Sequence, residues 1–438
     1  MMTTAATTES KMHSPKPTDR FGNPIDPIVG FARGSIIRSS VDEARRLRQG
    51  QAVAANRVRK LGPHSIGVFT GNQRDFPLKA EDLATLCEEW VGPGLFANDL
   101  REVAIAHLGG KSEDGVAVFN RTSAGIIATI AALAGGSSVV SVVPPGGRSH
   151  ASVIRGCAIA RVELVEIGGD RDWRAALANA KPQFVVVTTV TSALELLDDA
   201  ITSAVAEASH AAGGIVLVDD AYGARLRPVL HGGKPGLALG ADLAITNCDK
   251  AGLAGPRAGV LAGRANLVTA ASAKGAEFGM EARAPIAAGA MRSLQSFRPE
   301  DLREEARSGQ ALAVALAEKL GRDIVSVSDL GPMVDEQDVL ALVLRRSGRS
   351  AENFGLVPCE VSSALGMVLL RDAGILTVNT HGQPGARVSL RLKPTHDAIG
   401  HVGGQDAVVA AVDAALDYLA ARIDEVTTIS RLILGDQA

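Results

Sequence analysis

Short apolar runs alternate with longer stretches of helical spacing through the middle of the chain, from Val68 to Ala262. The longer stretches, such as Ser123–Ala134 and Asp198–Ala212, repeat apolar residues three and four positions apart. Strands and helices that alternate at this spacing predict an α/β fold, with a mainly parallel sheet covered by helices on both faces. The predicted strands are Val116–Phe119, Ser138–Val143, Arg161–Ile167, Phe184–Thr188, Ile215–Val218, Leu243–Thr246 and Gly259–Ala262.

The pattern changes after Arg298-Pro299. We predict a large domain over residues 71–298 and a smaller C-terminal α/β domain over residues 299–438, since a new set of elements begins there. In the smaller domain the pattern predicts a long amphipathic helix at Glu300–Leu320, strands at Val339–Leu344 and Arg387–Leu392, and a closing helix at Gln405–Ile423.

The N-terminal region has its own character. Residues 1–33 are mostly polar, and the first twenty lack the apolar stretch of a signal peptide, so we expect a disordered leader. Residues 34–70 are rich in arginine and carry helical spacing. This region is expected to form a helical arm that clasps a partner subunit, in a homodimer or a higher assembly of dimers. Contact with nucleic acid is the less favoured alternative.

Composition narrows the class of protein. Hydrophobic residues make up 46% of the 438 positions, and a net charge of −3 disfavours general binding of polyanions. The chain has no apolar run of membrane length, so no membrane partner is expected. The four cysteines are scattered without a C-x-x-C pair, which disfavours a metal site or a disulfide framework and predicts a cytoplasmic location. They are Cys87, Cys157, Cys248 and Cys359.

Two charged residues follow predicted strands. Lys250 comes after Leu243–Thr246 and precedes a loop of small residues that leaves space beside its amine. Desolvation there would lower its pKa and make it a nucleophile, whereas a surface lysine is the simpler alternative. Asp219 ends the strand Ile215–Val218, and Asp220 would point to the opposite side of an extended chain. A turn or helix cap is the alternative interpretation of this aspartate pair.

Other strand ends carry groups that could surround a ligand. Asn120, Arg121, Thr122 and Ser123 open a helix, where backbone N–H groups and hydroxyls can bind a phosphate. Thr246 could close this cup, and Ala221 presents a small face. His150 could lie flat against an aromatic ring, and Ser192 could bond a ring hydroxyl. An ordinary helix start is the less favoured alternative for both the cup and His150.

An amine, an acid, a phosphate cup and a flat wall are what pyridoxal 5'-phosphate requires of a protein. The amine forms a Schiff base with the cofactor aldehyde, and the acid keeps the ring nitrogen protonated so that the ring withdraws electrons. The carboxyl ends of parallel strands meet at one edge of a sheet, so the sequence can bring Lys250, Asp219 and His150 together.

These segments resemble the fold-type I pyridoxal-phosphate enzymes. Val218–Gly223 looks like the strand-end aspartate motif of that class, and His150–Gly156 is similar to the ring-stacking segment of α-oxoamine synthases. Asp249–Gly259 most resembles the lysine loop of bacterial selenocysteine synthase (L-seryl-tRNA selenium transferase) and its archaeal relatives, and Glu281–Ile286 also looks like a segment of that group. The resemblance covers about Val116 to Gln295. Arg257 departs from it, since glutamine is expected there.

The resemblance implies an enzyme that acts on a small amino acid. We expect a lyase or β-replacement enzyme that works through an external aldimine and an aminoacrylate. Cleavage of a C–C bond, as in threonine aldolase, and transamination are the alternatives, together with a tRNA-dependent selenium transferase. A binding protein that kept the fold without catalysis would not need both Lys250 and Asp219.

Recognition of the substrate carboxylate calls for an arginine. Arg387 is the first choice, because the class usually supplies this residue from the small domain, and Arg391 lies on the same face of the predicted strand. Arg283 and Arg257 could bind a second anionic group. Acid–base candidates without a distinguishing setting are His231, His381 and His396.

Overall fold

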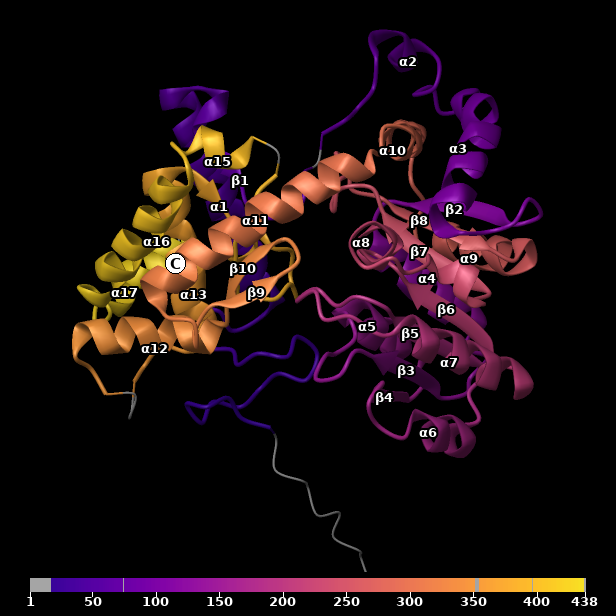
Figure 1. Ribbon diagram of the computed structural model, residues 1–438, viewed down its shortest axis with the longest axis horizontal. Coiled ribbons are helices and arrows are strands. Elements are labelled where there is room, and N and C mark those ends of the chain that lie inside the picture. Colours follow the sequence, from indigo (N-terminus) through magenta and orange to yellow (C-terminus); the bar gives the residue numbers. More distant parts are fainter. Residues whose placement is uncertain (1–16, 74, 351–353, 396, 437–438) are drawn as a thin grey trace, which may run out of the picture.

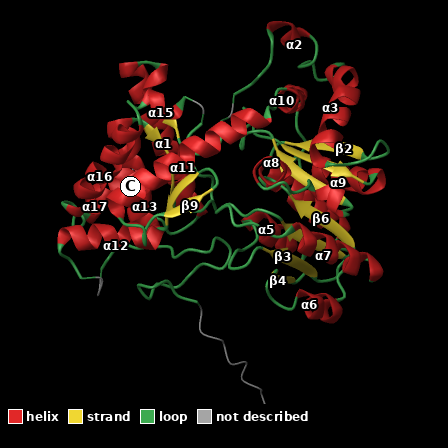
Figure 2. Ribbon diagram, viewed as in Figure 1, coloured by secondary structure: helices red, strands yellow, loops and turns green. Residues whose placement is uncertain are grey.

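The computed structural model describes residues 17–73, 75–350, 354–395 and 397–436. The chain forms two parts that lie side by side, and the long helix α11 (Pro299–Leu320) runs from one into the other (Figure 1). One part is built on a large sheet, and the other is mostly helical (Figure 2). The fold-type I architecture predicted from the sequence is confirmed, and the reset of the pattern at Arg298-Pro299 falls at the start of α11.

The large part contains a seven-stranded sheet in the order β2-β8-β7-β6-β5-β3-β4. All neighbouring strands are parallel except β8, which runs antiparallel to both β2 and β7. Every predicted strand of this sheet is present, with its ends shifted by a few residues at most. The strands are β2 (Gly115–Phe119), β3 (Val139–Val143), β4 (Leu164–Gly168), β5 (Phe184–Thr188), β6 (Ile215–Asp219), β7 (Leu243–Asn247) and β8 (Gly259–Gly263).

The central strands are apolar at almost every position because both faces of the sheet are covered. Along β5, Phe184 and Val186 enter one hydrophobic cluster, whereas Val185 and Val187 enter another on the opposite face. The first face packs against α4 (Thr122–Leu133), α5 (Ala151–Ala160) and α9 (Ala265–Glu277). The second packs against α3 (Gly92–Leu108), α6 (Trp173–Ala180), α7 (Asp199–Ala211) and α8 (Gly223–Leu230).

Helix α4 sits unusually close to the sheet because it contains a glycine where other residues would clash. A Cβ atom on Gly125 would lie 2.4 Å from Cδ1 of Ile245 on β7. The close approach brings the start of α4 beside the ends of the central strands. The remaining helices of this part are α2 (Ala80–Ala84), the 3₁₀ turn η2 (Gly236–Leu239) and α10 (Ala284–Gln295).

The smaller part has one apolar core, to which α11, α12, α13, α16 and α17 all contribute. It includes a three-stranded antiparallel sheet, β9-β10-β12, and a parallel pair, β1 and β11. The strands are β1 (Gly67–Val68), β9 (Ser326–Ser328), β10 (Gly331–Val334), β11 (Ile375–Leu376) and β12 (Leu390–Arg391). The helices are α12 (Glu336–Ser347), α13 (Pro358–Val368), α14 (Val378–His381), α15 (Ala398–His401), α16 (Gln405–Ala420) and α17 (Val426–Leu434), with a π turn, η3 (Leu369–Ala373), after α13.

Two expectations for the smaller part were wrong. Val339–Leu344 is not a strand but the middle of α12, whose first turn is capped by Asp335 through the N–H of Gln337 at 3.0 Å. A short, continuous apolar run fits a buried helix as well as a buried strand, and here the cap decides. Of the predicted strand Arg387–Leu392, only β12 pairs in a sheet.

The N-terminal region packs against the smaller part of the molecule. Residues 1–16 of the expected leader lie outside the described part of the chain, but residues 17–33 are packed rather than disordered, with Val29, Phe31 and Ala32 buried. The predicted arm is α1 (Ser40–Leu61), preceding the 3₁₀ turn η1 (Pro63–Ser65), and it packs on α14 and α17 of its own chain. Its Glu43 and Arg46 are fully buried there.

No helix among the described residues is long and apolar enough to cross a membrane. The same residues contain no cluster of histidine, cysteine or acidic side chains that could hold a metal ion.

Glu360 on α13 anchors the N-terminal segment. Its buried carboxylate accepts hydrogen bonds from the backbone N–H groups of Ile36 at 2.5 Å, Ile37 at 2.9 Å and Val357 at 3.1 Å. We predict that Glu360→Ala lowers the free energy of unfolding by at least about 2 kcal/mol, because each orphaned buried N–H costs about 1–3 kcal/mol. Thermal or urea unfolding measures the change.

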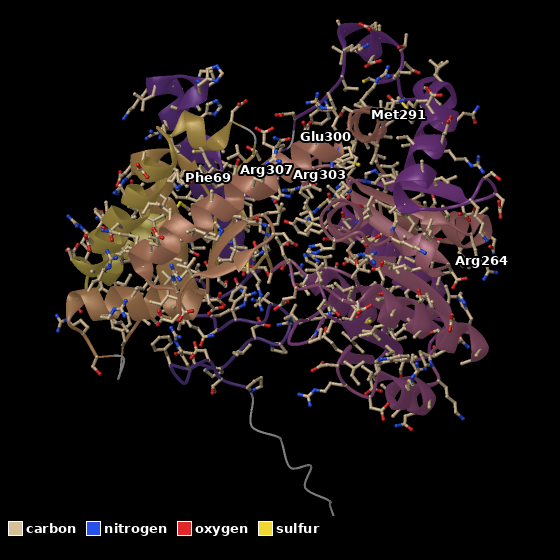
Figure 3. All side chains as sticks on the ribbon, viewed as in Figure 1. Phe69, Arg264, Met291, Glu300, Arg303 and Arg307 are labelled. Atoms are coloured by element: carbon tan, nitrogen blue, oxygen red, sulfur yellow. The ribbon has the colours of Figure 1, made fainter. Side chains whose placement is uncertain are left out.

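Glu300→Ala is the control for this variant. Glu300, labelled on α11 in Figure 3, is exposed and bonds Arg303 one turn away. It should change the free energy of unfolding by less than about 0.5 kcal/mol. Equal effects of the two variants would contradict the anchoring role of Glu360.

Candidate active site

A cavity opens at the carboxyl ends of β5, β6 and β7, and both parts of the molecule line it. Figure 3 shows side chains from the two parts filling the space between the ribbons. The large part contributes the start of α4 and the loops after β3, β5, β6 and β7. The smaller part contributes residues between Val378 and Lys393, and the N-terminal segment contributes Ile28 and Val29. This is the strand edge at which the sequence predicted a site.

Lys250 stands in the loop after β7 and lines the cavity. Its Nζ lies 4.3 Å from the centre of the Tyr222 ring, which gives the amine a cation–π contact. The next residue, Ala251, is in the left-handed region with φ of 53°, and it is buried. The turn therefore holds Lys250 in a defined position at the strand end.

Asp219 ends β6, the neighbouring strand, and also lines the cavity. Burial raises the pKa of Asp219 to about 6, although the positive charge of Lys250 and a hydrogen bond from the N–H of Ala221 at 3.3 Å act to lower it. Asp220 points the other way. Its carboxylate accepts bonds from Thr189 at 2.6 Å, Arg227 at 2.8 Å and the N–H of Gly236 at 2.8 Å.

A buried arginine joins the loops that follow β6 and β7. Arg225, on α8, donates from Nε to the carbonyl of Ala251 at 3.1 Å and from Nη2 to the carbonyl of Ala221 at 2.9 Å. It also bonds the carbonyl and the side-chain oxygen of Asn247 at 3.3 and 2.8 Å. The loop with Lys250 and the loop with Ala221 are thus held by one guanidinium.

The predicted phosphate cup is present in part. Arg121, Thr122 and Ser123 line the cavity at the start of α4. Gly259 lets β8 approach this turn closely, since a Cβ there would lie 2.6 Å from Cα of Thr122. Asn120 does not line the cavity, because it is turned outward and its backbone bonds the carbonyl of Met280.

Thr246 also does not line the cavity. Its hydroxyl accepts a bond from Arg225 at 2.9 Å and donates to the carbonyl of Asp220 at 3.1 Å. Side chains alternate along β7, so the threonine faces the arginine behind the strands rather than the cup.

His150 caps α5 from the cavity wall. Its Nδ1 accepts a bond from the N–H of Ser152 at 3.2 Å and lies 2.8 Å from the Ser152 hydroxyl. Desolvation of the imidazole in the cavity wall lowers the pKa of His150 to about 4, and the positive charges of Lys250, Arg121 and Arg155 act in the same direction. The imidazole is therefore neutral near pH 7, and its side chain is accessible from the cavity.

The smaller part supplies cationic groups. Arg387 and Arg391 line the cavity, as does Arg257 of the lysine loop, whereas Arg283 lies outside it, 69% exposed and paired with Glu89 at 3.1 Å. Among the histidines, His381 lines the cavity and His231 pairs with Asp329 at the surface. His396 lies outside the described residues.

Several lining residues were not foreseen from the sequence, chief among them Lys393, Thr188, Tyr222 and Arg148. Lys393 is fully buried, with Nζ 4.8 Å from the centre of the Tyr222 ring and 3.4 Å from the carbonyl of Ser192. Burial and the charges of Arg391 and Lys250 hold the pKa of Lys393 well below its ordinary value. Residues 387, 389 and 391 lie on one face of the predicted strand, and the next residue on that face is Lys393, so the strand pattern could have identified it.

Thr188 is the last residue of β5 and pairs in register with Asp219 on β6. Its hydroxyl is buried and has no hydrogen-bond partner among the residues that the structure describes. A buried hydroxyl without a partner is costly, so this atom suits a ligand polar group beside Asp219. Ser192 also lines the cavity, and its carbonyl accepts bonds from Arg391 and Lys393.

Comparison with known proteins agrees with this architecture. The family model for aminotransferase class I and II matches residues 91–397. A UPF0425 pyridoxal phosphate-dependent protein of Methanothermobacter thermautotrophicus is 34% identical over 91% of this chain and its own full length. Its counterpart in Methanococcus maripaludis is 30% identical over 81% of this chain and 93% of its length.

Two solved structures share the fold at low identity. SepCysS, solved in complex with the N-terminal domain of SepCysE, is 15% identical with a TM-score of 0.53, over 83% of this chain and 97% of its own. Ureidoglycine–glyoxylate aminotransferase of Bacillus subtilis is 13% identical with a TM-score of 0.52, over 82% and 97%. By its family match and its archaeal relatives, the chain belongs to the aminotransferase class I and II family, within the group of the UPF0425 proteins.

Proposed function

We propose that the protein is a pyridoxal-phosphate enzyme that removes or replaces a β-substituent of a small amino acid. The observation that carries the cofactor assignment is the pairing of Lys250 and Asp219, and the choice of β-substituent chemistry rests on the resemblance of Asp249–Gly259 to the lysine loop of selenocysteine synthase. Lys250 and Asp219 end neighbouring strands, open into one cavity and are held in relation to each other by Arg225. The relative that matches 91% of this chain over its own full length is named a pyridoxal phosphate-dependent protein, which supports the same cofactor here.

The residues present fit this cofactor. Thr122 and Ser123 at the start of α4 would hold the phosphate, with Arg121 and Arg257 as counter-charges. Asp219 would pair with the ring nitrogen, and the unpartnered hydroxyl of Thr188 beside it would bond a polar group of the ring. Ala221 and the neutral imidazole of His150 would lie along the ring faces. When bound, the cofactor supplies an electron sink that stabilises negative charge at the substrate Cα.

The protein groups around the substrate then direct the chemistry. The Lys250 amine accepts the Cα proton, and its contact with Tyr222 keeps the amine at a fixed place in the cavity. Arg391 orients the substrate carboxylate through its buried guanidinium. Burial and the charges of Arg391 and Lys250 lower the pKa of Lys393, so a second, neutral amine lies over the same Tyr222 ring as Lys250.

Elimination, transamination and C–C cleavage use the same first groups, so the choice needs an experiment. Transamination draws support from the aminotransferase family model that matches residues 91–397. Cleavage of a C–C bond, as in an aldolase, and tRNA-dependent selenium transfer are further candidate reactions for the same cavity.

A single-turnover experiment separates these reactions. We predict that amino acids with a β-leaving group give ammonia and a 2-oxo acid when no amino acceptor is present. Lys250→Ala should give neither product and should lose the covalent link that borohydride makes permanent, which mass spectrometry detects. Lys234→Ala, a change at an exposed lysine, should behave as the wild type. Conversion of the cofactor to its amine form without ammonia would identify an aminotransferase, and release of an aldehyde would identify an aldolase.

Asp219 and Asp220 form a matched pair for a test of the acid. As the pH falls through about 6, Asp219 takes up a proton and loses the charge that pairs with the ring nitrogen. We predict that wild-type affinity for the cofactor decreases below pH 6, and that Asp219→Asn weakens binding at least about a hundredfold at pH 7. Removing one partner of a buried charge pair costs about 3–5 kcal/mol. Equilibrium dialysis against the cofactor gives both values.

Asp220→Asn should affect the stability of the fold rather than the binding of the cofactor. It breaks the buried pair with Arg227 and should lower the melting temperature while the pH dependence of cofactor binding persists. If Asp220→Asn removed that pH dependence and Asp219→Asn did not, the two roles would be exchanged.

We also propose a symmetric dimer as the active form. Exposed apolar side chains concentrate at residues 76–95, and Trp90 is 91% exposed, which is costly in water unless a second copy covers it. We predict that Trp90→Asp yields monomers in sedimentation runs at micromolar concentration, where the wild type sediments as a dimer. Sedimentation of the wild type as a monomer with full activity would contradict the proposal. The exposed apolar residues of segment 76–95 are Phe76, Leu83, Trp90, Val91 and Leu95.

A further inference from the structure

We propose that the cavity contains a second anion subsite, formed by Arg148 and Arg387, and that the substrate is an amino acid whose side chain carries a carboxylate or a phosphate. The proposal rests on the function proposed above and specifies its substrate class.

The lining of the cavity carries a large excess of positive charge. Its acidic residues are Asp219, which faces the ring nitrogen in the proposed complex, and Asp249. The cationic residues are Lys250, Lys393, Arg121, Arg148, Arg257, Arg387 and Arg391. With Lys250 and Lys393 set aside as the amines of the reaction, five arginines remain in the lining. Arg148 and Arg387 are the two left over once the cofactor phosphate takes Arg121 and Arg257, and the substrate α-carboxylate takes Arg391.

The cations fall into two groups on different elements. Arg121 and Arg257 belong to the α4 turn and the lysine loop, where the cofactor phosphate would lie. Arg148 follows β3, and Arg387 and Arg391 come from the smaller part. Burial lowers the pKa of Arg148 and of Arg391, and the positive charge of Arg387 lowers both further, so the three side chains that line the cavity are neighbours. These three guanidinium groups therefore form a cluster separate from the phosphate cup.

Arg391 is the member best placed for the substrate α-carboxylate. It is 4% exposed, with Nε bonded to the Ser389 hydroxyl at 3.0 Å and Nη1 bonded to the carbonyl of Ser192 at 2.6 Å. Its Nη2 has no hydrogen-bond partner in the described part of the chain. Lys393 bonds the same Ser192 carbonyl and shares the Tyr222 ring with Lys250, so Arg391 lies on the side of the reacting amine.

Arg387 is then left for a different anion. Its side chain makes no hydrogen bond or ion pair with any residue that the structure describes. The loop before it is nevertheless firmly held, because Glu43 accepts a bond from the N–H of Gly385 at 3.0 Å and Arg46 donates to the carbonyl of Gly382 at 3.2 Å. The Arg387 guanidinium is therefore carried on a fixed loop, lines the cavity and is available to bind an anionic group of a ligand.

Arg148 faces Arg387 from the large part. Its Nη2 donates to the carbonyl of Pro27 at 2.7 Å, and its guanidinium packs against Gly30, where a Cβ would lie 1.6 Å from Nη1. The N-terminal segment thus holds this arginine against the cavity. Two guanidinium groups that line one cavity and repel each other gain from an anion that bonds both.

Two of the nearby acids are hydrogen-bonded to other groups. Glu166 accepts a bond from the N–H of Ser149 at 2.7 Å, and Glu195 accepts one from the hydroxyl of Thr191 at 2.6 Å. Glu336 is buried, and burial with the charge of Asp335 raises its pKa, although Arg387 and Arg391 oppose that shift. Glu166 acts electrostatically on Arg148, and Glu336 on Arg387 and Arg391, but neither carboxylate forms an ion pair with these arginines in the described part of the chain, so their guanidinium groups can still bind a ligand anion.

Binding of substrate analogues to the holoenzyme tests the proposal without turnover. The probes are 2-methylalanine, 2-methyl-L-aspartate and O-phospho-2-methyl-L-serine, which have no Cα proton to lose. Their dissociation constants can be measured by titration calorimetry and by the change in cofactor absorbance. We expect at least one of the two doubly anionic probes to bind about ten- to a hundredfold more tightly than 2-methylalanine. The tighter of the two identifies a carboxylate or a phosphate as the side-chain anion.

The variant Arg387→Gln should reduce that preference, the ratio of the two dissociation constants, to near one. Arg283→Gln is the matched control, an identical substitution outside the cavity, and should leave the ratio unchanged. Melting temperatures confirm that both variants are folded. Equal binding of all three probes to the wild type, or an unchanged ratio in Arg387→Gln, would overturn the subsite. A cofactor spectrum that no amino acid perturbs would instead overturn the proposed function.

Discussion

The guanidinium of Arg225 is the interaction on which the geometry of the site depends. A strand end fixes where a backbone leaves the sheet, but it does not fix the path of the loop that follows. Arg225 is fully buried behind these loops and bonds backbone oxygens of Ala221, Asn247 and Ala251. A neutral side chain could not satisfy so many carbonyl groups, whereas an arginine carries five donors in a fixed plane. The positions of Lys250 and Asp219 follow from this bracing.

Charge is the second constraint. The cavity is lined by cations from both the large part and the smaller part. Packing alone would not favour such an arrangement. Clustered cations lower the stability of the ligand-free protein, and ligands that carry several negative charges recover that loss. Desolvation lowers the pKa of Lys393 and of His150, and the same positive charges lower both further, so that neutral bases lie among fixed positive charges.

Much of this arrangement could be predicted from the sequence, because local pattern determines the strands and their ends. The strands of the large sheet, the edge at which Lys250, Asp219 and His150 meet and the start of α4 all followed from alternation and turn residues. Contacts between distant segments could not be predicted in this way. Thr246 was expected in the cup, but it bonds Arg225, which is 21 residues away in sequence and has no local signal of its role.

The smaller part was harder to predict for a related reason. The run Val339–Leu344 has no alternation, so its helical state is decided by the Asp335 cap and by packing on neighbouring helices. The roles of Arg148 and of residues 27–30 depend on a contact across the cavity that no periodicity encodes. The prediction for Arg283 failed in the opposite way. It was expected to bind an anionic group of the substrate, but it lies at the surface and pairs with Glu89.

The anchoring of residues 36 and 37 by Glu360 joins segments that are 323 and 324 positions apart in the chain. Ile28 and Val29, just before them, form one wall of the cavity. During synthesis, residues 28–37 emerge long before Glu360 and must therefore wait for more than three hundred further residues before they find their place. Contacts of such high sequence separation form late and slowly in folding. The cavity is completed only at the end of folding, and gain of cofactor affinity would mark that last step rather than the earlier formation of the sheet.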